Sequence, residues 1–258
     1  MTSALVQRVR ARPAARYVHP KALAAPADAG EHDAKLDVAD ENSPNYLAWI
    51  ADLIRPHLGD SVLEVGAGIG SITRLYAQGR RVVATDLSTD CVAAMEDRFR
   101  SSPNITVLRS DLRETAANDE RFDSIVMVNV LEHIEDDAGA LALLTRRLKP
   151  GGSIVVYVPA LNGLYGPWDR KVGHFRRYSK WRMRAIAREA GAELTELRYV
   201  NALAIPAWIA FSRTDVVKAQ ARSLSLWDRT GVPISRAIET RFRPPIGLNI
   251  LAVIRARR

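Results

Sequence analysis

The sequence has almost no cysteine, because its 258 residues include only Cys91. A single cysteine excludes an internal disulfide framework and any zinc cluster built from cysteines, and it suits a reducing compartment. Long apolar runs are also missing: ALAIPAWIAF at 202–211 is only ten residues long and contains Pro206. A membrane-crossing helix needs about 20 apolar residues. We therefore expect a cytoplasmic protein without a transmembrane segment.

Acidic residues are missing from both ends of the chain. Residues 1–27 and residues 241–258 each carry five basic side chains and no acidic one, and these ten exceed the net charge of +8. The opening segment also lacks the apolar core of a signal peptide, and we interpret 1–41 as a basic, flexible N-terminal segment. Basic ends leave open a contact with nucleic acid or an anionic membrane surface, beside the simpler interpretation of solvated tails.

Short apolar segments alternate with helical patterns along most of the chain. We expect a helix over 42–59, with Ser43 as its cap and Pro44 in its first turn, and further helices over 71–78 and 179–190. The expected strands lie in VLEVGA, RRVVATD, NITVLRSD, RFDSIVMVNV, GGSIVVYVP and ELTELRYV, with ILAVI as the last. This alternation predicts an α/β fold with a doubly wound sheet, in a single domain over 42–258.

Two segments interrupt this alternation. Residues 160–178 form a loop rich in Gly, Tyr and Trp, and residues 202–245 are interpreted as an inserted lid or helical segment. Within the second segment, ALAIPAWIAF is interpreted as a core or lid helix, with a shallow membrane contact as the alternative.

The stretch VLEVGAGIG (62–70) passes from an apolar strand directly into three glycines. Glycines at 66, 68 and 70 allow positive φ and let a ligand approach the backbone N–H groups. The spacing differs from the dinucleotide fingerprint G-x-G-x-x-G, because the third glycine comes one residue early. Asp86 ends the next strand, twenty residues after Gly66, where a carboxylate can accept hydrogen bonds from both ribose hydroxyls.

Together, VLEVGAGIG, ATDLS, LRSDL, FDSIVMVNVLEHIEDD and RLKPGGSIVVYVP resemble the successive motifs of class I S-adenosylmethionine-dependent methyltransferases. The resemblance covers about residues 42–200. It implies S-adenosyl-L-methionine as the cofactor. It also implies a seven-stranded Rossmann-like sheet in the order 3-2-1-4-5-7-6, with the last strand antiparallel and the ligand at the carboxyl ends of the strands.

The resemblance also implies roles for single residues. Asp111 and Asn129 each have a simpler interpretation, as a loop cap and as a turn residue at a strand end. The implied cofactor contacts are Glu64, Gly66, Ala67, Gly68 and Gly70 with the methionyl part, Asp86 with the ribose, Leu87, Asp111 and the Leu112 amide with the adenine, and Asn129 with the methionine end.

Two histidines lie where the methyl acceptor is expected. His133 follows the fourth strand, and His174 lies in the loop after the fifth. A histidine has a pKa close to neutral pH, so it can remove the proton from a hydroxyl acceptor. Both histidines are therefore candidate catalytic residues, and packing within their loops is the alternative. GHFRRYS (173–179) resembles a bacterial subgroup often found beside glycan or secondary-metabolite enzymes.

The same loop supplies candidate substrate-binding residues. Arg176 and Arg177 can bind a carboxylate or phosphate with two hydrogen bonds each, and Tyr178 and Trp168 can form an aromatic wall beside it. The alternative is that these arginines form an exposed basic face at the start of the next helix.

We therefore expect a methyltransferase acting on an oxygen of a small-molecule acceptor, a metabolite or a glycan-related compound, with no metal. RNA or protein methylation is the first alternative, but the fourth strand lacks the Asp/Asn-Pro-Pro-aromatic motif and no RNA-binding module is evident. A nicotinamide oxidoreductase is disfavoured by the glycine spacing. A catalytically silent cofactor-binding partner, docked on a membrane enzyme, stays open.

Overall fold

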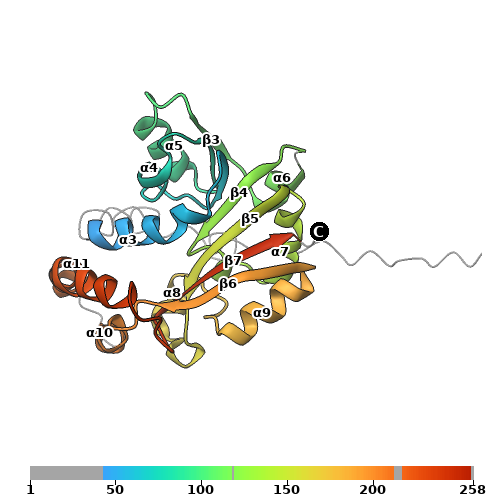
Figure 1. The fold of residues 1–258 in the computed structure, drawn as a ribbon. Helices are drawn as coiled ribbons and strands as arrows, with labels where there is room; N and C mark the ends of the chain where they lie inside the picture. The colour runs from blue at the N-terminus through green and yellow to red at the C-terminus, as the bar shows by residue number, and fades with distance from the viewer. Residues whose placement is uncertain (1–42, 118, 212–216, 257–258) are drawn as a thin grey trace, which may run out of the picture.

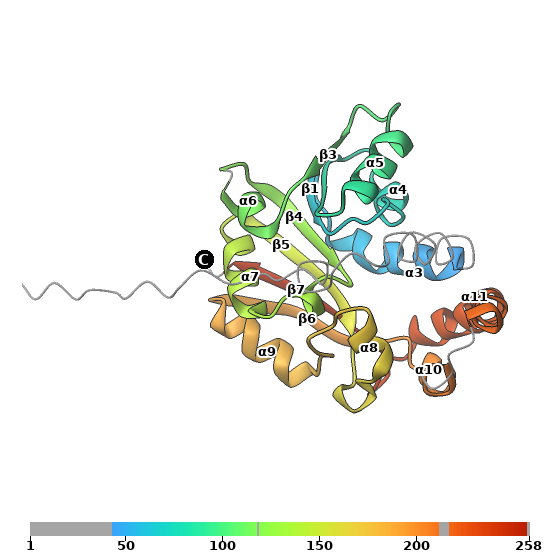
Figure 2. The ribbon, with the colours of Figure 1, turned by 180° about the vertical axis from the view of Figure 1, so that it is seen from behind.

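The computed structural model describes residues 43–117, 119–211 and 217–256, which form one central sheet with helices on both sides (Figure 1 and Figure 2). Segment 1–41, expected to be a flexible tail, lies outside the described residues. The strand order is β3-β2-β1-β4-β5-β7-β6, which confirms the predicted fold. The strands are β1 (Ser61–Val65), β2 (Arg81–Asp86), β3 (Ile105–Arg109), β4 (Phe122–Val128), β5 (Leu148–Pro159), β6 (Ala192–Val200) and β7 (Asn249–Ala256).

Strand direction places the site. Strands β1 to β5 pair in parallel, and β7, which contains ILAVI, runs antiparallel to both β5 and β6, as predicted. The carboxyl ends of β1 to β5 therefore meet at one edge of the sheet.

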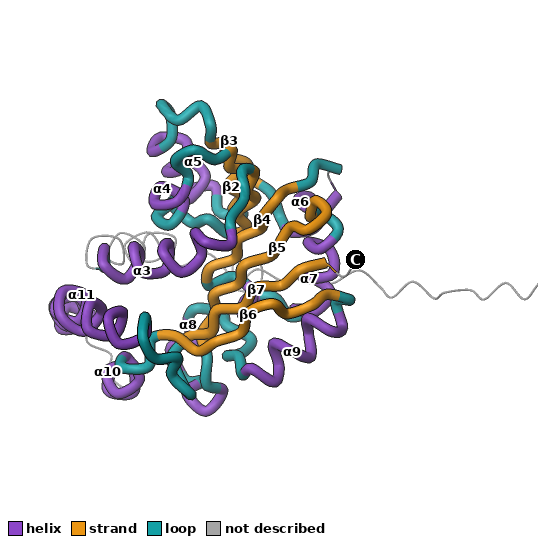
Figure 3. Tube along the Cα trace, viewed as in Figure 1, coloured by secondary structure: helices purple, strands orange, loops and turns teal. Residues whose placement is uncertain are grey.

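The helices cover both faces of the sheet (Figure 3). The helix expected over 71–78 is shorter, because α4 spans only four residues. The α-helices are α3 (Pro44–Ile54), α4 (Thr73–Tyr76), α5 (Thr89–Arg98), α6 (Leu112–Ala117), α7 (Asp137–Thr145), α8 (Pro167–Lys171), α9 (Lys180–Glu189), α10 (Ala204–Phe211) and α11 (Val217–Glu239); short 3₁₀ turns are η1 (Arg55–His57), η2 (Leu131–His133) and η3 (Asn162–Leu164).

Strand β5 shows how both faces are buried. Ile154 and Val156 pack into the cluster that includes α7 and α9, whereas Val155 and Tyr157 pack into the cluster that includes α3. A parallel sheet covered on both faces accepts apolar side chains at successive positions. This is why the middle strand β5 appears in the sequence as the apolar run IVVYV.

The N-terminus of α3 is capped by a distant residue. Pro44 opens the helix as expected, but Ser43 makes no side-chain cap, so that expectation is wrong. The carboxylate of Asp228, in α11, accepts from the backbone N–H groups of Asn45 at 3.1 Å and Tyr46 at 2.8 Å. A carboxylate is favoured at a helix N-terminus because it satisfies free N–H groups and opposes the positive end of the helix dipole.

Residues 202–245 were interpreted as a lid or helical segment, and their described part contains α10 and α11. Helix α11 lies beside α3 (Figure 1), and Trp208 of α10 stacks on Arg177 in the loop after β5. Among the described residues, no helix has both the length and the apolar character that a bilayer crossing requires.

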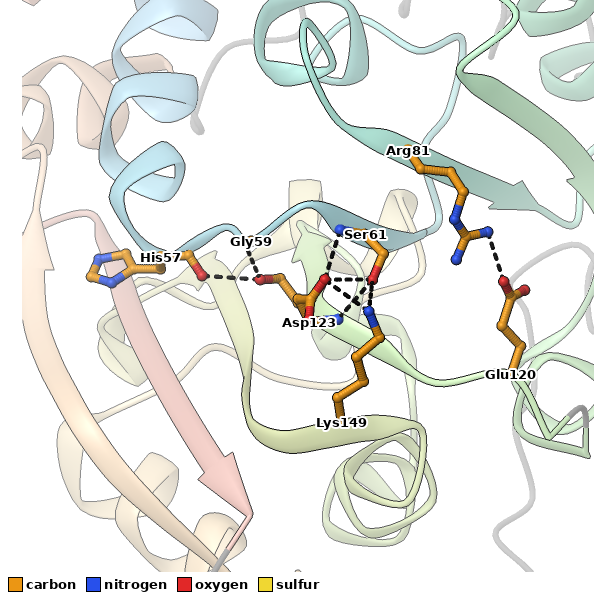
Figure 4. A network of polar contacts seen from close by, with 8 residues as sticks. His57, Gly59, Ser61, Arg81, Glu120, Asp123 and Lys149 are labelled. Carbon is orange, nitrogen blue, oxygen red and sulfur yellow. Dashed lines mark hydrogen bonds and ion pairs between the residues drawn. The ribbon is translucent and has the colours of Figure 1, made fainter.

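A second polar network ties the amino ends of the strands together (Figure 4). Asp123 Oδ2 accepts from Ser61 N at 2.9 Å and Ser61 Oγ at 2.7 Å, and Lys149 Nζ lies 3.0 Å from the same oxygen. These contacts join β1, β4 and β5 at the edge opposite the glycine loop. They belong to the scaffold of the sheet.

The cap from Asp228 predicts a stability effect. Asp228→Ala leaves two N–H groups of α3 without their acceptor, so we expect the free energy of unfolding to fall by about 1–3 kcal/mol. Urea denaturation measures this loss. The control is Asp97→Ala, since Asp97 makes an exposed i,i+3 pair with Arg100. Equal unfolding free energies for the two variants would contradict the capping role.

Candidate active site

The candidate site lies at the topological switch point of the sheet, beside β1. From β1 the chain continues to β2 on one side, and β4 lies on the other side of β1. Ligands of doubly wound folds bind at such a switch point, outside the carboxyl ends of the strands. The glycine loop 66–70, Asp86 and Asn129 follow or end three of the adjacent strands, so all of them lie at this edge.

The glycine loop leaves room for a ligand. Gly66 and Gly68 have φ of 68° and 59°, in the left-handed region that side chains disfavour. A Cβ on Gly66 would lie 2.6 Å from a methyl carbon of Val130, whereas a Cβ on Gly68 would meet no heavy atom within 4 Å. The loop is therefore packed on one side and open at Gly68. An open, side-chain-free loop of this kind fits a cofactor that approaches the backbone.

Asp86 is fixed at the end of β2 against this loop. Its Oδ2 accepts from Gly68 N at 2.9 Å, and its Oδ1 accepts from Ser88 N at 2.8 Å. Each carboxylate oxygen can accept more than one hydrogen bond. Both oxygens can therefore accept further hydrogen bonds, and the contact with the ribose stays a prediction.

The residues implied for the adenine lie after β2 and β3. Asp111 Oδ1 accepts from Glu114 N at 2.7 Å, and Glu114 Oε2 accepts from Asp111 N at 3.1 Å, so Asp111 caps α6. The simpler interpretation of Asp111 is thus present in the structure. The Leu112 side chain is buried and Leu87 is half-buried, so the adenine contacts stay a prediction.

Asn129, after β4, has the unusual backbone expected of a functional position. Its φ is 53°, it is exposed, and its N–H donates to Tyr157 O at 2.8 Å. Non-glycine residues with positive φ are uncommon, and Asn is among those that tolerate this conformation. The contact predicted with the methionine end stays a prediction.

Glu64 lies behind the loop rather than on its open side. Its Oε2 accepts from Thr73 Oγ1 and from Tyr76 OH, both at 2.6 Å, and the residue is 2% exposed. Burial raises the pKa of Glu64 to about 7. The carboxyl group therefore fixes α4 against β1, and any contact with the methionyl part stays a prediction.

The two histidines come together with a buried carboxylate. The rings of His133 and His174 meet edge to face with centroids 4.7 Å apart, and His174 Nε2 lies 3.8 Å from Glu132 Oε1. Glu132 is completely buried, and burial raises its pKa to about 8. Phe175 N donates to Glu132 O at 2.8 Å, which joins the loop after β5 to the turn after β4. The sequence did not predict this meeting.

Asp169 holds the other side of His174. Its Oδ1 lies 2.8 Å from His174 Nδ1 and accepts from Arg177 Nε at 2.8 Å, while its Oδ2 accepts from Gly166 N at 2.9 Å. These bonds lower the pKa of Asp169, although its burial opposes them. A carboxylate on Nδ1 fixes the orientation of the imidazole and leaves Nε2 for chemistry.

Two of the four residues expected to bind the substrate, Arg177 and Tyr178, instead make contacts within the protein. Arg177 is 3% exposed, pairs with Asp169 and stacks on Trp208 with a ring distance of 4.7 Å. Tyr178 is completely buried and donates to Asp137 Oδ2 at 3.1 Å. Neither can reach an acceptor in this arrangement, and we do not assign them to substrate binding.

Arg176 and Trp168, the other two members of that set, are less buried. Arg176 lies 2.8 Å from Asp137 Oδ2 and donates to Glu135 O at 2.8 Å. Trp168 is half-buried on α8. Their roles toward an acceptor stay predictions.

Glu132 and Asp169 are the candidate residues that the sequence interpretation missed. Each is an acidic residue near a candidate histidine, Glu132 directly before His133 and Asp169 five positions before His174. An acidic residue close to a histidine in a strand-end loop was the available signal. Its weakness is that acidic residues are equally common on solvated loops.

The fold and a match to a family model both support a methyltransferase. The 3-2-1-4-5-7-6 sheet, the open glycine loop after β1 and the carboxylate at the end of β2 agree with the class I S-adenosylmethionine-dependent methyltransferase fold that the sequence motifs resemble. Residues 63–156 match the sequence model of a family described as "Methyltransferase domain". The match covers the part of the chain that carries the glycine loop, Asp86 and Asn129, and it supports a methyltransferase domain there.

Curated methyltransferases are similar to part of this chain. The chain is 28% identical over 130 residues to the ubiquinone biosynthesis O-methyltransferase of Rickettsia bellii, which is 48% of this chain and 54% of the relative. It is 37% identical over 99 residues to the demethylmenaquinone methyltransferase of Tropheryma whipplei, which is 38% of this chain and 41% of the relative. The chain thus spans about half the length of the curated relatives that it matches.

Among solved structures, the chain resembles a Haloferax volcanii protein in complex with the Trm112 methyltransferase activator. The TM-score is 0.61 at 20% identity, and the match covers 89% of this chain and 96% of that one. At this identity the likeness concerns the fold.

The raised pKa of Glu64 predicts a pH-dependent stability. The folded protein prefers the protonated carboxyl, so this contribution is complete below the unfolded pKa near 4.5 and declines as pH rises to about 7. Glu64→Gln removes the decline. We expect the unfolding free energy of the variant, relative to wild type, to increase by about 2 kcal/mol from pH 5 to pH 8.

Urea denaturation at several pH values measures this difference. Glu193→Gln is the control, because Glu193 is exposed. Parallel stability curves for wild type and Glu64→Gln would show that the buried carboxyl does not titrate as described.

Proposed function

We propose that this protein transfers the methyl group of S-adenosyl-L-methionine to an oxygen atom of a small-molecule acceptor. The observation that carries the proposal is the cluster of His133, His174 and Glu132 at the same edge of the sheet as the glycine loop. A hydroxyl acceptor must lose its proton as the methyl group arrives, and a fixed imidazole can take it.

The cofactor would be held by the glycine loop and its neighbours. Gly68 lies on the open side of the loop, and Asp86 would accept from the ribose hydroxyls. We propose Leu87, Asp111 and the Leu112 amide for the adenine, and Asn129 for the methionine end. Glu64 would hold the glycine loop and α4 in place and would not contact the cofactor through Oε2, because this oxygen accepts from Thr73 and Tyr76.

S-adenosylmethionine supplies an already electrophilic methyl group on a sulfonium. The protein therefore has to align the acceptor oxygen in line with the carbon–sulfur bond, and alignment contributes most of the catalysis. His174 is the proposed proton acceptor, because Asp169 fixes its Nδ1 and leaves Nε2 toward Glu132. His133, in edge-to-face contact with His174, is the second candidate.

Oxygen as the acceptor atom is supported by two independent observations. The Rickettsia bellii relative is named an O-methyltransferase, and a histidine held by a carboxylate suits a hydroxyl. The single cysteine supports a reducing compartment, and we propose the cytoplasm.

Cofactor binding tests the role of Asp86. Asp86→Asn keeps the size of the side chain but removes its charge, and a charge-assisted hydrogen bond is worth roughly 1.5–3 kcal/mol. We expect affinity for S-adenosylmethionine to fall at least tenfold in calorimetry. Asp90→Asn, on the exposed start of α5, is the matched control. Unchanged affinity in Asp86→Asn would remove the ribose role.

Transfer itself is tested with methyl-labelled S-adenosylmethionine and extract of the host. We expect label in the small-molecule fraction, where the labelled compound can be identified. Label mainly in RNA or protein would contradict the proposed acceptor class. Label in no fraction, despite cofactor binding, would favour a silent partner protein.

With the acceptor known, His174→Ala tests the proposed proton acceptor. Loss of a positioned acid or base costs about 10²–10⁴-fold in rate, so we expect turnover to fall by that amount while cofactor affinity changes little. His57→Ala is the control, because His57 pairs with Glu196 outside the site. Wild-type turnover in His174→Ala would exclude this role.

A further inference from the structure

Glu132 is an anomaly in the described part of the chain. Its side chain is completely buried, yet neither carboxylate oxygen has a hydrogen-bond partner. A buried carboxylate without partners costs several kcal/mol, and buried polar groups in folded proteins are nearly always satisfied. Such a group calls for a ligand, an ion or a bound proton.

The neighbours of Glu132 are metal-binding side chains. One ligand atom each from Glu132, His133 and His174 can be chosen so that all three lie within 4.8 Å of one another. Ligand atoms bound to one zinc ion at 2.0–2.2 Å are about 3–4 Å apart. Small side-chain movements would therefore bring the three atoms onto one ion.

The ligand types of this cluster, and the residues that hydrogen-bond to them, also fit a cation. Two imidazoles and one carboxylate form the protein ligands of known catalytic zinc sites, which keep a further position open. Metal-binding histidines usually donate their other ring N–H to a carboxylate, and His174 Nδ1 lies 2.8 Å from Asp169 Oδ1. Asp169 is in turn held by Arg177 Nε at 2.8 Å. The cluster thus has a formed outer shell.

We propose that Glu132, His133 and His174 bind a divalent cation of the zinc type. This proposal departs from the expectation, based on sequence, that no metal is present. The catalytic effect of such an ion rests on the proposed function. An ion here would bind the acceptor oxygen and lower the pKa of its hydroxyl, so that the proton passes to water. His174 Nε2 would then hold the ion instead of taking the proton.

The competing explanation of Glu132 is a neutral, protonated carboxyl. Its raised pKa of about 8 applies to the cluster without an ion. A nearby cation would favour the ionised form instead. Metal titration separates the two explanations, because a neutral carboxyl packed between histidines has no need of a cation.

The experiment uses the full chain, freed of any affinity tag and stripped with a chelator. We expect Zn²⁺ to bind at one ion per chain in calorimetry, and Co²⁺ to give an absorption band typical of nitrogen and oxygen ligands. Glu132→Gln and His174→Asn should each weaken binding at least tenfold. Asp169→Asn should weaken it about 10–100-fold, as outer-shell partners do.

The matched control is His57→Asn. His57 Nε2 lies 3.5 Å from Glu196 Oε2, so it is a second histidine–carboxylate contact, and the described residues offer no third ligand to it. It should leave Zn²⁺ binding unchanged. Absence of stoichiometric binding, or equal affinity in wild type and Glu132→Gln, overturns the proposal. Affinity for S-adenosylhomocysteine shows in each case that the variant is folded.

The metal proposal and the proposed function can fail separately. Full methyl transfer by the chelator-treated protein overturns the catalytic role of the ion and leaves the function standing. Stoichiometric Zn²⁺ binding without transfer to any small molecule leaves the site standing and contradicts the function.

Discussion

Burial of both faces of the sheet is the constraint on which the rest of the structure depends. A charged side chain in the middle of such a strand loses its water, so polar groups collect at the strand ends. Asp86 and Asn129 lie at the carboxyl edge, and Asp123 lies at the opposite edge. Glu64 lies within β1 and is an exception to this rule. Its burial disfavours the charged carboxylate and raises its pKa. Chemistry and scaffold are thereby separated to opposite ends of the same strands.

The sequence predicted the parts of the molecule that local pattern determines. Apolar runs identified the strands because both faces of the sheet are covered, and the glycines at 66–70 identified the loop because a side-chain-free backbone has few other uses. The strand order followed from the resemblance of the motifs. At the site, the sequence placed Asp86, Asn129 and the two histidines after the correct strands.

Long-range partners could not be predicted in the same way. Ser43 was the local candidate for the cap of α3, but Asp228 arrives from a helix far along the chain. Arg177 was a candidate for substrate binding because a guanidinium can clamp a carboxylate or phosphate, yet Asp169 and Trp208 enclose it. Such pairings depend on how distant segments pack, and a single sequence contains no periodic signal for them.

The loop after β5 is held at its C-terminal end, residues 175–178, which affects how acceptor preference can change. Phe175 N bonds to the turn after β4, Tyr178 N bonds to Pro159 O at 2.8 Å, and Arg176 reaches Asp137 on α7. This end of the loop is therefore held by the turn after β4, by the end of β5 and by α7. We therefore expect acceptor preference to change through loop positions that leave Asp169, His174 and these contacts in place.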